Sequence, residues 1–284
     1  MKSLTTYITE KMIHTKDNSK QVYDYHPETN EELKDIIEKL VDEQSMEDII
    51  NLNSIDTSKI TDMSDLFEDM EGLIKIDMSG WDVSKVEDMG SMFKGCINLE
   101  KIIGIEDWDV SNVTNMLEMF KGCEKFNCDL SNWNISKAED IRYMFNRCYE
   151  FNQPLNDWDV SNIKYMEGMF YKCESFNQPL DKWNVSKVNN MSFMFEGCKS
   201  FNQPLNDWNV SNVISMNRMF YQCTKFNQPL NKWDISNVEY MANMFADCES
   251  FNQDISNWDL STVEDMSWIF MGCKIKEKYK PKFK

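Results

Sequence analysis

The sequence predicts an α/β solenoid of strand–turn–helix units, with a parallel sheet on one face and a small helical cap at the N-terminus. Two observations carry this prediction: one column of Trp, and fixed Phe and Cys positions behind it. The Trp column consists of Trp81, Trp108, Trp133, Trp158, Trp183, Trp208, Trp233 and Trp258. Its first step is 27 residues and every later step is 25. A Phe follows each Trp after twelve residues and a Cys after fifteen. This register is the signature of repeats that stack on their neighbours.

The unit of residues 151–175 predicts a short strand around its Trp. Trp158 and Val160 alternate with Asp157 and Asp159, which is the period of two of a strand with one buried face. At about 4.8 Å between neighbouring strands, nine such units would form a parallel sheet roughly 40 Å long.

A helix is expected after each strand. Ser161 is a good N-cap, and Ile163, Met166, Met169 and Phe170 follow it at steps of three and four. The capping-box pattern of Ser with Glu three residues later recurs at Ser84 and Glu87, Ser136 and Glu139, Ser236 and Glu239, and Ser261 and Glu264. Each unit is therefore interpreted as a strand, a capped helix and a turn.

Three regions are expected along the chain. Residues 51–273 form about nine repeats of 25 residues, the first of them degenerate because Ile55 stands in place of Trp. Residues 1–50 form a mostly helical N-terminal cap. Within it Leu4 to Ile13 is one candidate helix, and Thr29 with Glu32 opens another that runs to about Val41. Residues 274–284 form a Lys-rich tail, which either lies back along the repeats or frays.

Most of the repeated columns are interpreted as structural. The Trp column and the Met–Phe stripe are assigned to the core, and the Cys column is assigned to buried free thiols. A column of Asn that starts at Asn127 is expected to form a hydrogen-bonded ladder between neighbouring coils. The only His residues are His14 and His26, so a zinc site of Cys and His has little support.

The best candidate for function is the strand face opposite Trp. Its candidate partner-binding residues are Asp107, Asp109, Asp157, Asp159, Asp207, Asn209, Asp234 and Asp259. Like charges on adjacent strands repel each other, and a basic partner or Ca²⁺ would relieve that repulsion. The alternative is a plain solvated face on which Asn and Lys dilute the charge.

Charge and composition exclude several classes of function. The formal net charge is −18, which repels phosphate backbones and anionic membranes, so no nucleic-acid partner is expected. No window of about 18 apolar residues suggests a membrane span, and Met1 to Thr15 lacks the apolar core of a secretory signal. The expected location is therefore the cytoplasm or a virion. No nucleophile–base pair, phosphate loop or metal motif is found, which predicts no enzyme and no cofactor.

The run from Phe151 to Ile163, Phe-Asn-Gln-Pro-Leu-Asn-Asp-Trp-Asp-Val-Ser-Asn-Ile, resembles a known family. With the Met and Met-Phe that follow, it is similar to the BspA-like leucine-rich repeats, in the subgroup first noted in mycoplasma surface lipoproteins. The resemblance spans about Ile55 to Cys273. It implies a leucine-rich-repeat-like horseshoe or rod and a role in adhesion or protein recognition. The missing export signal departs from the surface members and suggests a phage or viral protein.

The sequence thus predicts a non-enzymatic, monomeric scaffold that recognises a protein with a basic surface through the acidic strand face. The alternative is an adhesion or carbohydrate-binding module of a surface or virion protein. An exposed aromatic row would favour the alternative, and buried Trp would weaken it.

Overall fold

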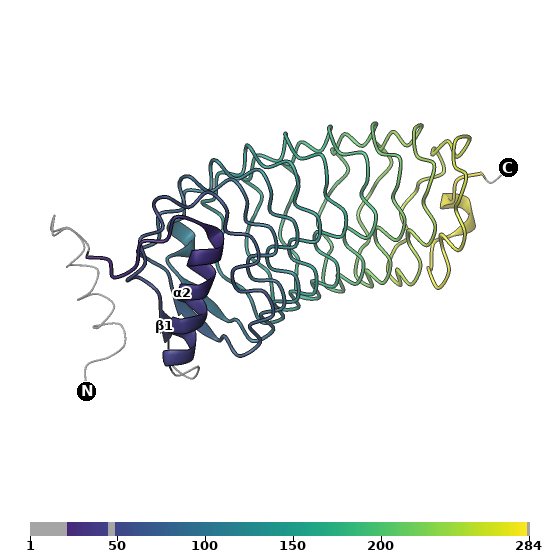
Figure 1. The fold of residues 1–284 in the computed structure, drawn as a ribbon. Helices are drawn as coiled ribbons and strands as arrows, with labels where there is room; N and C mark the ends of the chain where they lie inside the picture. The colour runs from purple at the N-terminus through teal and green to yellow at the C-terminus, as the bar shows by residue number, and fades with distance from the viewer. Residues whose placement is uncertain (1–21, 45–48, 283–284) are drawn as a thin grey trace.

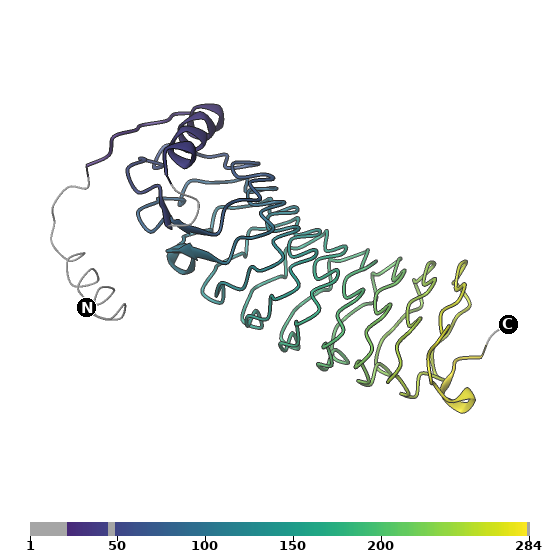
Figure 2. The ribbon, with the colours of Figure 1, turned by 90° about the horizontal axis from the view of Figure 1, so that it is seen from below.

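The repeats lie side by side as stacked coils (Figure 1). The computed structural model describes residues 22–44 and 49–282. Residues about 25 positions apart are hydrogen-bonded neighbours: the Phe145 N–H donates to the Met169 carbonyl at 3.0 Å, and the Phe170 N–H donates to the Met194 carbonyl at 3.0 Å. The two ends of the described chain therefore lie at opposite ends of an elongated stack (Figures 1 and 2).

Helix α2 (Asn30–Glu43) closes the N-terminal end of the stack, which confirms the helix predicted after Thr29. The Thr29 hydroxyl accepts the Glu32 N–H at 3.2 Å, as an N-cap does. Leu33 and Ile37 are fully buried against the first coils. The other expected helix, Leu4 to Ile13, lies outside the described residues.

Three short strands follow α2 in a parallel sheet of order β1-β2-β3. They are β1 (Ile49–Asn51), β2 (Lys75–Asp77) and β3 (Lys101–Ile103), with Ile50 opposite Ile76 and Ile76 opposite Ile102. A 3₁₀ turn, η1 (Ile105–Asp107), follows β3. The longer, 27-residue step of the Trp column contains β3.

Side chains replace this backbone ladder in the later coils, where the corresponding segment reads Asn-Gln-Pro. Pro154 has no N–H to donate. Instead the Asn152 N–H donates to Asn127 Oδ1, and Gln153 Nε2 donates to the Asn127 carbonyl, both at 3.0 Å. The same bonds recur up to Asn252, so the predicted Asn ladder is confirmed, although its members are half-buried or exposed rather than buried.

The helix expected in each repeat does not form in the described coils, and this prediction is wrong. Residues 163–173 are turns and isolated bridges. The Gly168 and Lys172 N–H groups donate to the next coil instead of to their own coil four residues back. The Ser–x–x–Glu pattern also has another role, because the Glu139 N–H donates to the Thr114 carbonyl of the preceding coil.

The parallel pairing between later coils lies in the segment where the helix was expected. It consists of single bridges, for example Asp140 with Tyr165 and Asn190 with Ser215, rather than a sheet along the Trp column. The Trp segment bends too sharply for a strand: the Trp158 N–H donates to the Leu155 carbonyl and the Ile163 N–H to the Val160 carbonyl. The predicted strand around Trp is therefore also absent from these coils.

The core is one continuous cluster in which each column stacks on itself. The eight Trp side chains of the column are between 3% and 6% exposed. Trp183 and Trp208 stack with ring centroids 6.3 Å apart, and Phe170 and Phe195 stack at 5.7 Å. Trp183 Nε1 also donates to the Leu155 carbonyl of the preceding coil at 2.9 Å, so the indole keeps a polar partner inside the core.

The Lys-rich segment packs against the last coil up to Lys282 and includes the 3₁₀ turn η2 (Glu277–Tyr279). The Ile255 N–H donates to the Tyr279 carbonyl at 3.0 Å, and the Lys276 N–H donates to Asn252 Oδ1 at 3.0 Å. Ile275 is 6% exposed. The described tail therefore covers part of the final coil rather than fraying.

Candidate functional site

The residues of the predicted acidic face are all exposed, but they lie in turns and unassigned backbone, so the face is not a strand face. Five of its eight members accept a hydrogen bond from the N–H of the Ser two residues later. Asp159 Oδ1 accepts the Ser161 N–H at 3.0 Å. The equivalent bond to Ser is made by Asp109, Asn209, Asp234 and Asp259. These side chains fix a bend in the backbone, which explains why Asp or Asn follows every Trp of the Trp column.

Ion pairs use two more members of the acidic face. Lys182 Nζ lies 2.6 Å from Asp157 Oδ1, and Lys232 Nζ lies 2.7 Å from Asp207 Oδ1 in the equivalent coils. The pKa of Asp159 is held below its ordinary value by hydrogen bonding from the Ser161 side chain and then its backbone N–H. The expected repulsion between carboxylates is thus relieved within the chain itself.

A different face carries the residues that vary from coil to coil. The residue ten positions after each Trp of the Trp column forms a second column, which we call the αL column. Its members are Ser91, Glu118, Tyr143, Gly168, Phe193, Arg218, Asn243 and Trp268. These are eight different amino acids at eight equivalent positions. All have positive φ, between 54° and 63°. Elsewhere in the repeat Trp, Phe and Cys keep their positions, so this variation is concentrated on one side of the stack.

Positive φ makes the αL column costly for most of its side chains. Only Gly, Asn and Asp adopt this region readily, and another residue there costs about 1–2 kcal/mol. Tyr143, Phe193, Arg218 and Trp268 are therefore poor choices for the backbone they occupy. Backbone strain that persists in several coils is typical of positions kept for what the side chain contacts.

Tyr and Arg gather around the αL column. The chain contains three Arg, and all three, Arg142, Arg147 and Arg218, lie in the segments that cross this face. The Arg142 guanidinium carbon lies 5.2 Å from the centre of the Tyr165 ring, and that of Arg218 lies 5.2 Å from the Tyr221 ring. We call the surface formed by residues 142–147, 165–172, 192–197 and 214–222 the variable face.

A buried carboxylate supports the centre of the variable face. Glu196 is 3% exposed, and its Oε1 lies 3.7 Å from Arg218 Nη1. Its other oxygen, Oε2, has no hydrogen-bond partner among the described residues. Burial raises the pKa of Glu196, while the nearby charges of Arg218 and Lys172 act in the opposite direction. The carboxylate therefore holds Arg218 across the face.

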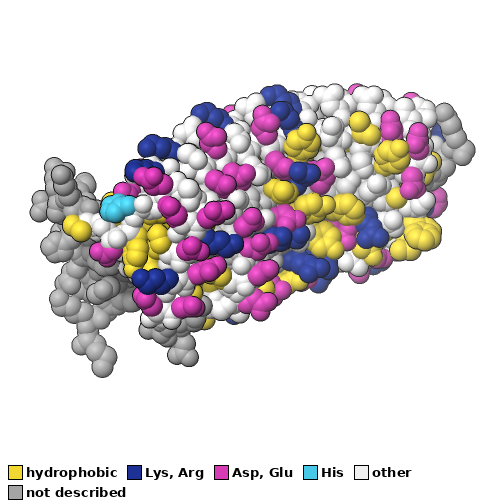
Figure 3. All heavy atoms as spheres, viewed as in Figure 1, with side chains coloured by type: hydrophobic (Ala, Val, Ile, Leu, Met, Phe, Trp, Pro, Cys, Tyr) yellow, Lys and Arg dark blue, Asp and Glu magenta, His cyan; other side chains and the backbone are white. Residues whose placement is uncertain are grey.

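The space-filling view shows a contrast along the stack (Figure 3). Acidic side chains dominate the N-terminal half of the visible face, and hydrophobic side chains are more numerous over the C-terminal half. Tyr165, Ile214 and Tyr240 are among the large hydrophobic side chains that remain exposed, at 43%, 41% and 36%.

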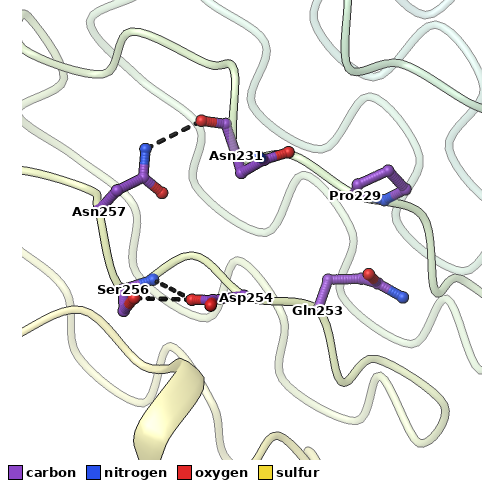
Figure 4. Close-up of a pocket in the computed structure, with 6 residues that line it drawn as sticks. All are labelled: Pro229, Asn231, Gln253, Asp254, Ser256 and Asn257. Atoms are coloured by element: carbon purple, nitrogen blue, oxygen red, sulfur yellow. Dashed lines mark hydrogen bonds between the residues drawn. The ribbon is translucent and has the colours of Figure 1, made fainter.

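A hollow lies between segments 229–231 and 253–257 of neighbouring coils (Figure 4). It is lined by Pro229, Asn231, Gln253, Asp254, Ser256 and Asn257. Its polar groups bind one another: Asn257 Nδ2 donates to the Asn231 carbonyl at 2.9 Å, and the Ser256 hydroxyl donates to Asp254 at 2.7 Å. Its one carboxylate is thus committed to a turn.

The thiols are buried hydrogen-bond donors. All nine Cys are free, and only Cys128 and Cys273 are partly exposed. Cys148 Sγ lies 3.0 Å from the Phe120 carbonyl of the preceding coil, and the column repeats this contact. Burial raises the pKa of Cys96 to about 12. Within the described residues, no three His, Cys, Asp or Glu side chains are grouped as a metal site, and no helix is long and apolar enough to cross a membrane.

Three overlapping segments, residues 34–104, 99–203 and 172–282, match the family model described as "Mycoplasma protein of unknown function, DUF285". The chain belongs to this family. Searches of the curated proteins and of the solved structures found no match. DUF285 membership supports a mycoplasma-type repeat protein, and the description of the family assigns it no function.

The sequence contains a signal for the variable face, although the surface that it was expected to use for binding is the acidic face. Aligning the units shows that Asp109 and its equivalents are nearly constant, whereas the αL column is different in every coil. Constant polar positions in a repeat are more often structural than specific to a partner.

Proposed function

We propose that this DUF285 protein is a non-enzymatic recognition scaffold: a leucine-rich-repeat-like, BspA-like solenoid that presents its variable face to a protein partner. The observation that supports this proposal is the αL column, where eight coils hold eight different residues at positive φ, six of them neither Gly nor Asn. A repeat protein with a constant core and one variable face is suited to binding an extended surface of a partner.

The composition of the variable face favours a protein as the partner. Tyr and Arg are enriched among the residues that dominate binding energy at protein interfaces. Tyr143, Tyr165 and Tyr221 each have a cationic side chain within 6 Å of the ring. Such pairs stiffen long side chains before binding, which reduces the entropy lost on association.

The acidic face is the less favoured surface for this role. Asp159 and its equivalents are engaged by Ser, and Asp157 and Asp207 are engaged by Lys. A basic partner would have to compete with these contacts. The Trp column is buried, so it offers no stacking platform for a sugar.

The test is affinity capture from a lysate of the native source, with captured proteins quantified by mass spectrometry. The variable-face variant combines Arg142→Ala, Tyr165→Ala and Arg218→Ala. A matched variant of the acidic face combines Asp107→Ala, Asp157→Ala and Asp207→Ala. Each variant must first show the melting temperature of the wild type within the error of the measurement.

We expect a partner that both the wild type and the acidic-face variant capture and that the variable-face variant loses. Loss from the acidic-face variant alone would contradict the choice of face. Capture of soluble glycans, lost with Tyr165, would contradict the protein partner and favour the adhesion module. A partner retained by both variants would contradict recognition through either face.

A further inference from the structure

In segments 141–147, 191–197, 216–222 and 241–247 the backbone hydrogen bonds between neighbouring coils all point forward, whereas Tyr165, Ile214 and Ser215 donate back to the preceding coil. The N–H groups of Met241, Asn243 and Asp247 donate forward to carbonyls of the last coil, at 2.8, 2.8 and 2.7 Å. The same forward pattern is found between earlier coils, for example from Phe145 to Met169. Aligned peptide dipoles of this kind leave carbonyls at the first coil and N–H groups at the last.

Helix α2 covers the first coil, at the N-terminal end of these rows of backbone hydrogen bonds. Asn30 Nδ2 donates to the Ser64 carbonyl at 2.9 Å and to the Asp62 carbonyl at 3.3 Å, so two carbonyls of the first coil have a partner. Leu33 and Ile37 turn the apolar side of α2 toward the coils. The opposite side of the helix faces outward.

That outward side is an acidic stripe. Glu31, Asp35, Glu38 and Asp42 are spaced four, three and four residues apart, which places them along one line of a helix. All four are exposed, and none forms an ion pair or a hydrogen bond with the residues that the structure describes. The end of the stack formed by α2 therefore presents four carboxylates that have no partner among the described residues.

The C-terminal end has a different character, because the tail covers only part of the last coil. The N–H groups of Met266, Trp268 and Gly272 have no acceptor among the described residues. Trp268 is 71% exposed and Met271 is 47% exposed at the same edge. The adjoining tail adds exposed lysines: Lys274, Lys276, Lys278 and Lys282. Unpaired N–H groups, exposed lysines and apolar area are thus found on the last coil and its tail, together with the exposed carboxylates of Glu264 and Glu277.

We propose that this protein associates head to tail with a second copy of itself, the acidic stripe of α2 in one copy against the Lys-rich C-terminal end of the next. Carboxylates accept the free N–H groups and pair with the tail lysines, while Trp268 and Met271 lose their exposure to water. The net charge of −18 does not prevent this contact, because salt screens charges beyond about 8 Å at physiological ionic strength.

The two symmetric arrangements are disfavoured. Two C-terminal ends would bring donors against donors and lysines against lysines, and two N-terminal ends would bring acidic stripes together. Head-to-tail contact uses two different surfaces, so it does not close on itself and extends into open chains. This inference is independent of the proposed function, and it departs from the monomer expected from the sequence.

The test is sedimentation velocity of the full chain at protein concentrations from about 1 to about 100 µM, a range that detects weak association. An N-end variant carries Glu31→Lys, Asp35→Lys, Glu38→Lys and Asp42→Lys. A C-end variant carries Lys274→Glu, Lys276→Glu and Lys278→Glu. A control variant, Glu106→Lys, Asp107→Lys, Glu139→Lys and Glu150→Lys, matches the N-end charge change at exposed positions away from both ends. Melting temperatures establish that each variant is folded.

We expect the wild type and the control to form species that grow with concentration and dissociate as salt is raised. Each end variant alone should remain a monomer, because both of its ends then carry the same charge. Mixing the two end variants should restore assembly, since each supplies the charge that the other lacks. A wild type that stays monomeric, or end variants that still assemble alone or fail to assemble when mixed, would overturn the proposal.

A second readout uses Trp268, since the eight Trp residues of the column are buried. Acrylamide should quench its fluorescence in dilute protein and quench it less as assembly proceeds. Trp268→Ser tests the apolar contact without altering charge, and it should weaken assembly at least several-fold. Unchanged assembly in this variant would contradict the placement of the last coil in the interface.

Discussion

The ring of Tyr143 occupies the space in which a side chain at position 168 would stand. A Cβ atom placed on Gly168 would lie 2.3 Å from Tyr143 Cε1, and Gly168 has a φ of +58°. The one Gly in the αL column therefore makes room for the aromatic ring of the preceding coil. The position of the Tyr143 ring on the variable face thus depends on the absence of a side chain at Gly168 in the next coil.

Gly168→Ala should destabilise the protein for two separable reasons, and Gly122→Ala provides the control. Both Gly residues have positive φ, so each substitution should cost about 1–2 kcal/mol of unfolding free energy. At Gly122 a Cβ meets nothing closer than 3.6 Å, whereas at Gly168 it also displaces Tyr143. Denaturant unfolding should therefore show a larger loss for Gly168→Ala.

A double-mutant cycle isolates the displacement of the ring. Adding Tyr143→Ala to Gly168→Ala removes the clash, so the two substitutions should be less damaging together than the sum of their separate effects. Simple additivity would show that the ring moves aside without cost.

Trp183→Ala should reduce the unfolding free energy by about 3–5 kcal/mol, because the substitution opens a cavity in the stacked core. The Trp183 side chain is 3% exposed, and its Nε1 donates to the Leu155 carbonyl, which would lose that donor. Trp268→Ala is the matched control, since the Trp268 side chain is 71% exposed and should tolerate truncation. Equal losses in thermal or urea unfolding would contradict the core assignment of the Trp column.

The sequence predicted the repeat, its register and its buried columns because these depend on spacing alone. Trp183 and Cys198 recur at fixed steps, and a residue that recurs in every coil without a charge is most simply placed in a shared core. The capping box at Thr29 also predicted α2, since a local hydrogen bond defines that helix start.

The secondary structure inside the repeat was not predictable in the same way. Steps of three and four from Ile163 to Phe170 indicate a helix, but the same spacing also suits successive turns that bury Met166 and Phe170. Neighbouring coils decide between the two, because they accept the N–H groups that a helix would use internally. The sequence alone does not reveal that competition, which also decides which side chains share one face of the stack.

The nine thiols should react in an order set by their burial. Native protein should react with a disulfide reagent first at Cys128 and Cys273, which are partly exposed, and only slowly at the other seven. Burial raises the pKa of Cys148 and Cys173, which lowers the reactive thiolate fraction. Mass spectrometry of the labelled protein identifies the order, and denatured protein should give nine equivalents. Early labelling of Cys148 would show that the coils open locally.

We call Asp109, Asp159 and Asp234 the Ser-capped carboxylates, because each accepts a hydrogen bond from the Ser two residues later. Replacing them with neutral residues should leave the stability at pH 7 unchanged and reduce the loss of stability in acid. Hydrogen bonding from the following Ser holds the pKa of Asp109, Asp159 and Asp234 below the ordinary value of 3.8. A carboxyl whose pKa is lower in the folded state stabilises the fold above its unfolded pKa. That contribution is lost as pH falls through the folded pKa. The loss should therefore begin near pH 3.8 and grow below it.

The variant with Asp109→Asn, Asp159→Asn and Asp234→Asn should match the wild-type melting temperature near pH 7, because Asn accepts the same bond. Asn184 and Asn209 already do so, each from the N–H of the Ser two residues later, at 3.2 Å. On acidification the variant should lose less stability than the wild type. A control with Asp107→Asn, Glu150→Gln and Glu249→Gln should keep the wild-type acid response. If the two variants lose stability in parallel, the Ser-capped carboxylates are not the groups that couple folding to protons.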